Sequence, residues 1–466
     1  MDEFKLLIDG RLEDGDLEME VINPATEEVL AKAPRASKAQ LERAVAAAKG
    51  AFPLWSATPV AERSKALQAI SGIIQANAGE LARLLTQEQG KPLADATGEV
   101  FGLAAMFRYF SQFELRAKVL EESGARKVEV SRKPLGVVGL IVPWNFPLII
   151  LGAKLPPALL AGNTVVLKPA PTTPLATLHL ARLLKDALPP GVLNVIADAN
   201  DLGAELTRHP DVRKISFTGS SATGRKVMAS AADTVKRLTL ELGGNDAGIV
   251  LDDADPEKVA PGIFHGAFRN SGQVCIAVKR LYVHESIYER MCEELARLAR
   301  EAVVGDGLEQ GTQLGPLQNR MQYEKVKAII ADARRHGRVL SEGPVPDKGY
   351  FIRPTIVADI EDGTPLVDEE QFGPVLPLIK YSDPEDALAR ANAGPYGLGA
   401  SVWSSNLARA HALAERLEAG TVWINKHSEL APDIPFGGAK QSGMGVEMGE
   451  AGLEEFTQLQ VINAAL

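Results

Sequence analysis

The residues Gly136-Val137-Val138-Gly139-Leu140-Ile141-Val142 form a short apolar run bounded by turn-forming residues, which is typical of a buried strand. The run leads directly into Pro143-Trp144-Asn145-Phe146-Pro147, where two prolines constrain the backbone. Similar runs at 164–167 and 214–217 are separated by stretches long enough for helices. Strands that alternate with helices predict a parallel sheet covered on both faces, and such sheets bind ligands at the carboxyl ends of their strands.

Helical periodicity dominates the residues before this sheet, and a second alternation of strands and helices follows it. Ser37 and Gln40 have the spacing of a capping box, which marks the start of the first helix. Thr173-Pro174 predicts another helix, capped by the threonine and with proline in its first turn. The later alternation predicts a second α/β domain. The predicted helices span 38–50, 61–77, 80–89, 95–114, 286–300, 322–336 and 384–392, and the later strands span 247–251, 280–283, 375–381, 420–424 and 456–462.

The composition argues against several classes of protein. The 466 residues include 50 Lys and Arg and 60 Asp and Glu, and the net charge of −10 argues against a nucleic-acid partner. The most apolar region, 135–160, is interrupted by prolines and polar residues, so no membrane helix is predicted. The segment 1–5 lacks the pattern of a secretory signal, which predicts a cytoplasmic protein. Two cysteines and seven scattered histidines predict neither a disulfide framework nor a structural metal.

Cys275 is the candidate nucleophile of this chain. Free cysteine is more often a buried apolar side chain than a reactive one. Cys275, however, lies in the segment 270–277, which contains glycine and polar residues and connects two predicted elements, and loops of this kind often carry chemistry. Cys292 lies among apolar residues at helical spacing, so we interpret it as part of a helix core.

Polar residues that follow the predicted strands are candidates for binding and catalysis. The loop 217–226 runs from a strand into a helix, whose N-terminus favours an anion, although the loop matches neither a Walker loop nor GxGxxG. Asn145 lies between two prolines that would orient its amide toward an oxyanion. Lys168 can bind ribose or phosphate, and Glu241 can act as a base if it faces Cys275. Each of these residues alone is also compatible with an ordinary turn or a solvated charge.

Together these segments resemble the aldehyde dehydrogenase superfamily over essentially the whole chain. The resemblance rests on seven motifs in the family's order and approximate spacing: PWNFP at 143–147, KPA at 168–170, FTGS at 217–220, ELGG at 241–244, GQVC at 272–275, EEQFGPV at 369–375 and PFGG at 435–438. It implies an α/β fold with a Rossmann-like cofactor domain (1–117 and 137–243), an α/β catalytic domain (244–454) and a small β oligomerisation arm (118–136 and 455–466). Because an exposed strand edge of that kind invites pairing, a homodimer or homotetramer is expected.

The resemblance also implies the oxidation of an aldehyde to a carboxylic acid with NAD or NADP as cofactor. It implies Cys275 as the nucleophile that forms a thioester, and Asn145 with the Cys275 N–H as the oxyanion donors. Glu241 is implied as the base that activates water, and Glu447 as a carboxylate in proton relay.

Further residues are implied to bind the cofactor and the aldehyde. Gly219 and Ser220 would contact the pyrophosphate, Lys168 the adenosine ribose, and Glu370 with Phe372 the nicotinamide ribose. The complete set of implied cofactor contacts is Ile141, Val142, Pro143, Trp144, Lys168, Gly203, Phe217, Gly219, Ser220, Gly224, Leu242, Glu370 and Phe372. The implied substrate pocket contains Met106, Val274, Ile276, His427 and Leu430.

Three positions near the adenosine site depart from the family's pattern. Pro171 stands where NAD-preferring members often have a glutamate that binds the ribose hydroxyls, and Ala197 and Ala199 stand where many relatives have glycine, while Gly203 is retained. NAD is the expected cofactor, and NADP remains possible.

The substrate and the reaction type leave alternatives open. Apolar residues in the implied pocket predict an uncharged aliphatic or aromatic aldehyde, whereas Lys426 and His427 leave room for an acidic semialdehyde. A coenzyme A-acylating dehydrogenase usually lacks the glutamate found here as Glu241. A catalytically silent binding protein on the same fold is the remaining alternative, and the presence of Cys275, Glu241 and Asn145 argues against it.

Overall fold

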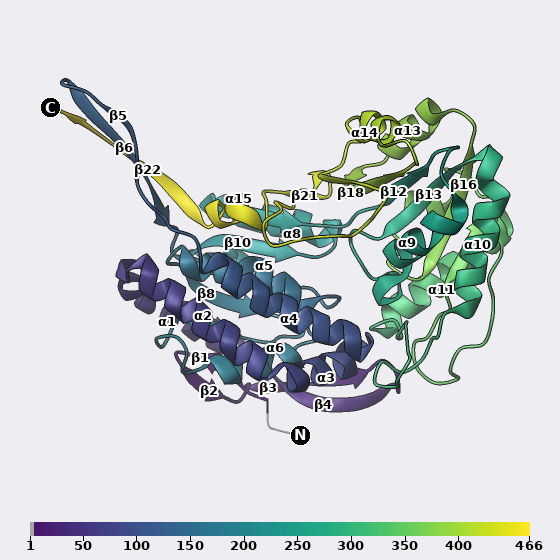
Figure 1. Ribbon diagram of the computed structural model, residues 1–466. Helices are drawn as coiled ribbons and strands as arrows, with labels where there is room; N and C mark the ends of the chain where they lie inside the picture. The colour runs from purple at the N-terminus through teal and green to yellow at the C-terminus, as the bar shows by residue number, and fades with distance from the viewer. Residues whose placement is uncertain (1–3) are drawn as a thin grey trace.

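A computed structural model describes residues 4–466 of the chain. Residues 1–3, which begin the segment that predicts a cytoplasmic protein, lie outside the described residues. Two sheets lie in opposite parts of the molecule, each flanked by helices, and a narrow β arm projects from one of these parts (Figure 1). Among the described residues, no helix is both long and apolar enough to cross a membrane.

The first sheet has eight strands in the order β2-β1-β9-β8-β7-β10-β11-β21. The five strands from β9 to β11 are parallel, and antiparallel strands complete both edges. The chain moves outward from β7 to β9 and returns with β10 on the other side of β7, so the strand order reverses between β7 and β10. The strands are β1 (Leu6–Ile8), β2 (Arg11–Glu13), β7 (Val137–Ile141), β8 (Thr164–Lys168), β9 (Leu193–Val195), β10 (Val212–Thr218), β11 (Arg237–Glu241) and β21 (Gly443–Met444).

Helices from the first half of the chain pack on this sheet, and α2, α4 and α5 lie side by side (Figure 1). Strands β7 and β8 are buried along their whole length, as their apolar sequences predict. The helices are α1 (Lys38–Ala57), α2 (Val60–Ala76), α3 (Ala78–Gln89), α4 (Leu93–Phe110), α5 (Pro147–Leu160), α6 (Leu175–Leu184), α7 (Gly203–Arg208) and α8 (Ser221–Ala231).

Helix α1 begins at the predicted capping box but ends later than predicted. Ser37 and Gln40 cap each other, which confirms the start of the helix. The helix continues past Gly50 and contains Pro53. Near its end the buried Trp55 donates its indole N–H to the carbonyl of Leu159 at 3.2 Å. Packing against α5 therefore stabilises a final turn that glycine and proline disfavour locally.

The predicted cap of α6 is wrong. Pro174 occupies the N-cap position rather than the first turn, and the Thr173 hydroxyl has no hydrogen-bond partner among the described residues. The buried Glu88 carboxylate instead accepts the N–H groups of Leu175 and Ala176, at 2.7 and 2.9 Å. A side chain distant in sequence thus satisfies the helix N-terminus, and this cannot be inferred from the local pattern.

The second sheet has seven strands in the order β14-β15-β16-β13-β12-β18-β19, all parallel except β14. This confirms the second predicted alternation of strands and helices. Its strands are β12 (Asp246–Val250), β13 (Val278–His284), β14 (Arg338–Val339), β15 (Thr355–Ala358), β16 (Val375–Tyr381), β18 (Gly399–Trp403) and β19 (Thr421–Ile424). The helices are α9 (Pro256–Phe268), α10 (Tyr288–Glu301), α11 (Arg320–His336), α12 (Pro365–Asp368), α13 (Pro384–Asn392) and α14 (Leu407–Ala414).

The projecting arm is a three-stranded antiparallel sheet in the order β22-β6-β5 (Figure 1). Strand β22 (Thr457–Ala465) comes from the end of the chain and pairs along β6 (Arg126–Pro134), which also pairs with β5 (Lys118–Glu122). On β22, Leu459, Val461 and Ile462 are all more than half exposed. The remaining short elements are β3 (Leu17–Asn23), β4 (Glu28–Arg35), β17 (Tyr396–Gly397), β20 (Ala439–Lys440) and α15 (Gly449–Glu454).

Candidate active site

The carboxyl ends of the central strands meet along one edge of the first sheet. Strand pairing places Ile141 opposite both Lys168 and Phe217, and Thr218 opposite Glu241. Neighbouring strands lie about 4.8 Å apart, so these residues form a continuous row across the adjacent strands β8, β7, β10 and β11. The row includes the point where the strand order reverses, which is where open parallel sheets bind ligands.

Strand β11 connects this edge directly to the second sheet. After Glu241 the chain passes through Leu242-Gly243-Gly244 and enters β12 at Asp246. Asp246 pairs with Val278, the first residue of β13, and Cys275 lies shortly before that strand. The candidate base and the candidate nucleophile therefore meet between the carboxyl edge of one sheet and the amino edge of the other.

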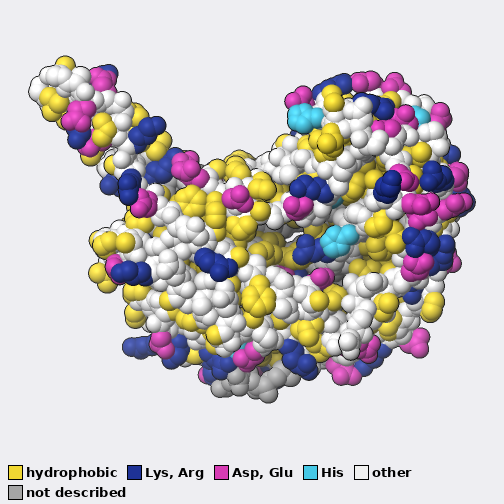
Figure 2. All heavy atoms as spheres, viewed as in Figure 1, with side chains coloured by type: hydrophobic (Ala, Val, Ile, Leu, Met, Phe, Trp, Pro, Cys, Tyr) yellow, Lys and Arg dark blue, Asp and Glu magenta, His cyan; other side chains and the backbone are white. Residues whose placement is uncertain are grey.

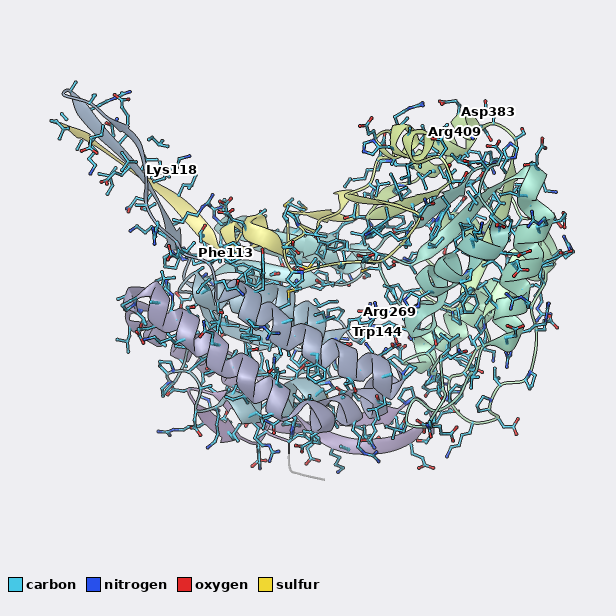
Figure 3. The ribbon with its side chains drawn as sticks, in the orientation of Figure 1. Phe113, Lys118, Trp144, Arg269, Asp383 and Arg409 are labelled. Carbon is cyan, nitrogen blue, oxygen red and sulfur yellow. The ribbon has the colours of Figure 1, made fainter. Side chains whose placement is uncertain are left out.

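The surface is hollowed where the two sheet regions meet. Figure 2 shows this hollow in the middle of the visible face, with basic and histidine side chains at its border. In Figure 3 Trp144, which follows β7, and Arg269, which follows α9, both lie in the space between the two regions. Residues from both halves of the chain therefore line this opening.

A strained turn precedes the candidate nucleophile. Asn270, Ser271 and Gly272 have φ angles of 50°, 54° and 72°, so three successive residues adopt the left-handed conformation. Residues other than glycine persist in this costly conformation only where surrounding contacts enforce it. Here Asn270 donates its amide to the carbonyl of Asn145 at 3.1 Å, and Ser271 donates its hydroxyl to the carbonyl of Gly315 at 2.6 Å.

Side chains hold four successive carbonyl groups around Cys275. The amide of Asn145 donates to Gln273 O at 2.9 Å. The ammonium of Lys279 donates to Val274 O at 2.9 Å and to Cys275 O at 2.5 Å. His427 Nε2 and the Ser428 hydroxyl donate to Ile276 O at 2.9 and 2.6 Å. We call residues 273–276, with these bonds, the nucleophile loop.

Lys279 and Ser428 were not identified as candidates from the sequence. His427 was expected in the substrate pocket, and its contact with the nucleophile loop was not predicted. Lys279 is only four residues beyond Cys275, but its role depends on a fold of the loop that no local pattern shows. The His427 side chain has no exposed surface, because it lies against the nucleophile loop and near Asp246. Its part in a substrate pocket stays a prediction.

The electrostatic surroundings of Cys275 disfavour its thiolate. Burial raises the pKa of the Cys275 thiol to about 12. Lys279 opposes this shift, whereas the nearby carboxylates of Glu241, Asp246 and Glu370 add to it. Glu370 also lies 3.5 Å from the Lys279 ammonium, so the charge of Lys279 is shared between a carboxylate and the nucleophile loop.

Glu241 has a buried carboxylate that forms no hydrogen bond with any described residue. Both of its oxygens lack a partner among the described residues, and only 3% of the residue is exposed. Burial raises its pKa well above the ordinary value, and the charge of Glu447 adds to the shift while Lys154 opposes it. Glu447 itself is paired with the buried Lys154, and Ser216 donates its hydroxyl to Glu447 at 3.3 Å.

Asn145 is held by a second buried ion pair. Lys91 donates to the backbone carbonyl of Asn145 at 2.8 Å and pairs with Glu99. The other carboxylate oxygen of Glu99 accepts the N–H groups of Leu148 and Ile149, which lie in the first turn of α5, at 2.8 and 3.2 Å. Asn145 is therefore held at its backbone carbonyl by Lys91 and Asn270, and its side-chain amide is held by Gln273 O.

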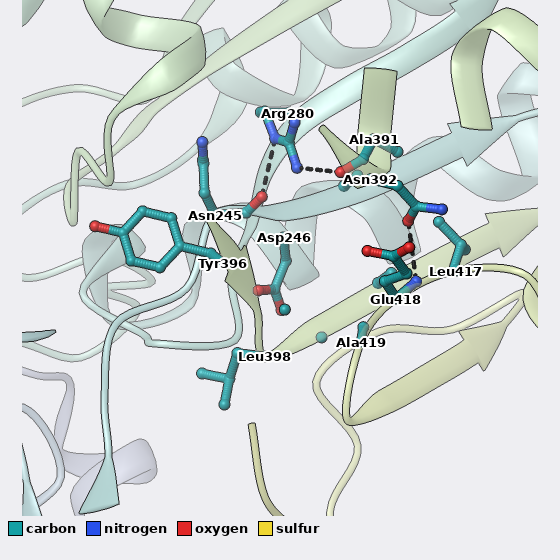
Figure 4. Close-up of a pocket in the computed structure, with 14 residues that line it drawn as sticks. Asn245, Asp246, Arg280, Ala391, Asn392, Tyr396, Leu398, Leu417, Glu418 and Ala419 are labelled. Atoms are coloured by element: carbon teal, nitrogen blue, oxygen red, sulfur yellow. Dashed lines mark hydrogen bonds between the residues drawn. The ribbon is translucent and has the colours of Figure 1, made fainter. Parts of the chain in front are cut away.

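A small pocket at the start of β12 shows how this strand is fixed (Figure 4). Arg280 donates to the carbonyl of Asn245 at 2.9 Å and to that of Ala391 at 3.0 Å. These bonds tie the segment that follows Glu241 to the second sheet. Asp246, Tyr396 and Leu398 also line this pocket.

The sheet edge offers groups suited to the phosphates and riboses of a dinucleotide. Ser220 caps α8, an 11-residue helix whose N-terminus lies at the carboxyl end of β10 and favours phosphate. Gly224 allows the close packing of α8, because a Cβ there would overlap Leu242. Gly243 similarly leaves room for Glu370, which accepts the N–H of Gly244 at 3.0 Å. The rings of Trp144 and Phe372 meet edge to face at 5.3 Å.

Lys168 is paired with a residue that the sequence analysis did not identify. Its ammonium lies 2.5 Å from Asp198 Oδ1, and both side chains are buried. Asp198 Oδ2 accepts the N–H of Leu202 at 2.8 Å, so both carboxylate oxygens are bonded. The implied adenosine contact is thus part of an ion pair whose overall charge is zero. Gly203 lies beside this pair, since a Cβ at its position would come within 3.8 Å of Lys168 Cε.

The other implied site residues lie in these same regions. Ile141, Val142 and Phe217 are buried at strand ends, and Val274, Ile276 and Met106 are buried in the nucleophile loop or in α4. Leu430 is 40% exposed in the loop after β19. Within residues 4–466, no group of His, Cys, Asp and Glu side chains has an arrangement that could hold a metal ion.

Comparisons with known proteins agree with this arrangement. A family model described as the aldehyde dehydrogenase family matches residues 12–462. The mitochondrial aldehyde dehydrogenase of Leishmania tarentolae is 40% identical in an alignment of 471 positions, which covers 99% of this chain and 95% of the relative. The NAD+ complex of an aldehyde dehydrogenase from Bacillus cereus is 36% identical, with a TM-score of 0.97 over 100% of this chain and 97% of that chain.

An NADP-dependent enzyme of E. coli is also similar in structure. It is 37% identical, with a TM-score of 0.97 over 100% of this chain and 98% of that chain. The fold agrees with the α/β class expected from the sequence. The chain therefore belongs to the aldehyde dehydrogenase family and is an NAD(P)-dependent oxidoreductase that acts on aldehydes.

Proposed function

We propose that the chain oxidises an aldehyde to a carboxylic acid through a thioester on Cys275, which water activated by Glu241 then hydrolyses. The observation that carries this proposal is the Glu241 carboxylate. It is buried, both of its oxygens are free of hydrogen bonds within the described residues, and it lies near enough to Cys275 to raise the pKa of the thiol. An unpartnered buried carboxylate is costly to maintain, which supports a chemical role.

Asn145 and the backbone N–H of Cys275 stabilise the oxyanion that forms when the thiolate attacks the aldehyde carbon. The Asn145 amide has two N–H groups, of which one is used by Gln273 O. The second N–H is available for the oxyanion. Lys91 and Asn270 of the strained turn donate to the backbone carbonyl of Asn145 and fix the residue, so its amide needs little reorganisation during the reaction.

Residues along the sheet edge would hold the cofactor. The N-terminus of α8 with Gly219 and Ser220 suits the pyrophosphate, Lys168 suits the adenosine ribose, and Glu370 with Phe372 suits the nicotinamide ribose. When bound, NAD supplies the acceptor for the hydride that leaves the former aldehyde carbon. We propose NAD rather than NADP, because Asp198 cancels the charge of Lys168 and a 2′-phosphate would gain little from that cation.

Glu241 removes a proton from the water that attacks the thioester. Its raised pKa makes it a stronger base than an exposed carboxylate. Glu447, Lys154 and Ser216 form a bonded cluster whose charges influence Glu241. We propose this cluster as the route by which the proton leaves the buried site.

The experiment that tests this reaction compares the wild type with Cys275→Ala. We expect the wild type to form reduced nicotinamide from an aldehyde without added coenzyme A, and the variant to lose at least about 10⁴-fold in kcat. Product formation that requires coenzyme A would instead favour the acylating alternative. Absence of turnover with any aldehyde would favour a silent binding protein.

We also propose the domain boundaries and the assembly that the family resemblance implies. The proposed boundaries are 1–117 with 137–243, 244–454, and 118–136 with 455–466. The separation into two sheets and an arm supports them, although β21, within 244–454, pairs with β11 at the edge of the first sheet. The exposed apolar residues of β22 suit pairing with another copy in a homodimer or homotetramer. The cytoplasmic location stays a prediction.

For the aldehyde, the buried apolar residues Met106, Val274 and Ile276 are compatible with an uncharged substrate. Lys426 and His427, which kept an acidic semialdehyde as an alternative substrate, do not provide a free charge. Lys426 pairs with Glu429 at 3.1 Å, and His427 is buried against the nucleophile loop. A choice between the two substrate classes therefore depends on other charged residues near the opening.

A further inference from the structure

Arg269 is a basic residue at the opening of the site, and no described residue pairs with its charge. It follows α9 as the C-cap residue and directly precedes the left-handed turn that leads to Cys275. Its side chain is only partly exposed. Within residues 4–466 its guanidinium takes part in no hydrogen bond and no ion pair, and the one ring that it contacts is that of Phe146. This residue was not among the candidates identified from the sequence.

The guanidinium lies beside the residue that follows the oxyanion donor. Its central carbon is 5.4 Å from the centre of the Phe146 ring, and the buried Lys91 ammonium is 3.7 Å from the same centre. Phe146 is adjacent to Asn145, whose amide reaches the nucleophile loop. Arg269 therefore lies close to the reacting centre, at the opening where Figure 3 also shows Trp144.

The charged groups around Arg269 leave its charge uncompensated. His265, one turn earlier on α9, has its pKa lowered by burial and further by the charge of Arg269. The charge of Asp95, in α4, raises the pKa of the same histidine. Asp95 does not come within ion-pair distance of Arg269. A partly buried guanidinium without a partner has lost part of its hydration and gains from binding an anion.

We infer that the physiological substrate is an aldehyde with a carboxylate at its other end, and that Arg269 binds this carboxylate. This inference rests on the proposed function and names its substrate class. Arginine forms paired hydrogen bonds with a carboxylate, which would orient the aldehyde end toward Cys275. The apolar side chains of Val274 and Ile276 suit the aliphatic or aromatic spacer between the two ends.

The test compares matched aldehydes with and without the carboxylate. The pairs are succinic semialdehyde with butanal, glutaric semialdehyde with pentanal, and 4-carboxybenzaldehyde with 4-methylbenzaldehyde. We expect the wild type to prefer the acidic member of at least one pair by about tenfold or more in kcat/KM. In Arg269→Gln this preference should fall by about 10- to 100-fold, mainly through KM, while the neutral member keeps its kcat/KM within about twofold.

Two further variants separate the possible results. Arg269→Lys should retain part of the preference, because it keeps the charge without the paired donors. Lys426→Gln, which removes a paired basic residue after β19, should leave the preference unchanged. Equal turnover of both members of every pair by the wild type, or an equal loss on both in Arg269→Gln, would overturn the carboxylate inference alone. No turnover of any aldehyde would overturn the proposed function with it.

Discussion

The carboxyl edge of the first sheet and the nucleophile loop contribute to the same site, but different interactions hold them in place. At the sheet edge, backbone pairing aligns Lys168, Ile141 and Phe217, and the side chains follow from the register. In the loop, side chains from separate parts of the chain bind successive carbonyl groups. Single side-chain substitutions should therefore disturb the loop more than the edge.

Among the substitutions that compare these two regions, we expect the largest effect where the regions meet, at Glu241. In Glu241→Gln the thioester should form but hydrolyse slowly, so steady-state turnover should fall by about 10²- to 10⁴-fold. Rapid-mixing measurements should show a burst of about one reduced nicotinamide per active site. Because the base must be deprotonated and its pKa is raised, wild-type hydrolysis should increase with pH through that pKa. Unchanged steady-state turnover would remove Glu241 from the mechanism.

Asn145→Ala tests the side-chain amide that donates one N–H to the nucleophile loop and, we propose, the other to the oxyanion. Loss of one oxyanion donor costs on the order of 3 kcal/mol, so kcat should fall by about 10²- to 10³-fold. The measurement is kcat with a saturating aldehyde, with the melting temperature as a control for folding. Full activity in a folded variant would show that the amide only holds Gln273.

Lys279→Met tests the electrostatic part of the loop. Because Lys279 lowers the pKa of the Cys275 thiol against a stronger effect of burial, its removal should raise that pKa further. A shift of one pKa unit reduces the thiolate about tenfold, and iodoacetamide should then modify Cys275 about tenfold more slowly at about pH 9.

Lys325→Met is the matched control for this prediction. Lys325 also contacts Glu370, donating to its backbone carbonyl at 2.8 Å, but it lies at the surface outside the loop. We expect iodoacetamide to modify Cys275 in Lys325→Met at the wild-type rate. Equal rates in all three proteins would show that Lys279 has only a structural role.

Asp198→Asn tests the sheet edge. We expect a smaller effect there, a change in the preference between NADH and NADPH. Loss of the carboxylate frees the charge of Lys168 for a 2′-phosphate, so the ratio of the Kd values for NADPH and NADH should fall by up to about tenfold. Binding can be followed by the fluorescence of the reduced cofactors without any aldehyde. Asp201→Asn, which removes a carboxylate of the same loop paired with Arg35, should leave the ratio unchanged.

Much of the fold could be predicted from the sequence because buried parallel strands require continuous apolar runs. The predicted run 136–142 forms β7 (Val137–Ile141), and the strand Val375–Tyr381 appears in the structure with its predicted bounds. Predictions failed where a distant side chain replaced a local signal. Trp55 extends α1 beyond its glycine and proline, and Glu88 caps α6 in place of Thr173.

The candidate site was predictable to a similar extent. Motifs after strands indicated Asn145, Lys168 and Glu241, because strand ends must lie at one edge, and the loop before a strand indicated Cys275. Lys279, Asp198 and Arg269 carry no such motif. Their importance comes from what each one touches or fails to touch, which is known only after the chain has folded.

The amino-acid sequence was sufficient for the family, the α/β class and the main candidates for chemistry, since these depend on periodicity and on motifs within short segments. Only the tertiary structure showed that Lys279 and Asp198 form buried ion pairs while Arg269, among the residues described, forms none. The physical reason is that the strength of a charge depends on burial and on partners brought from distant segments. We propose that the Lys168–Asp198 pair bears on cofactor choice and Arg269 on substrate choice, and both features arise only in the folded chain.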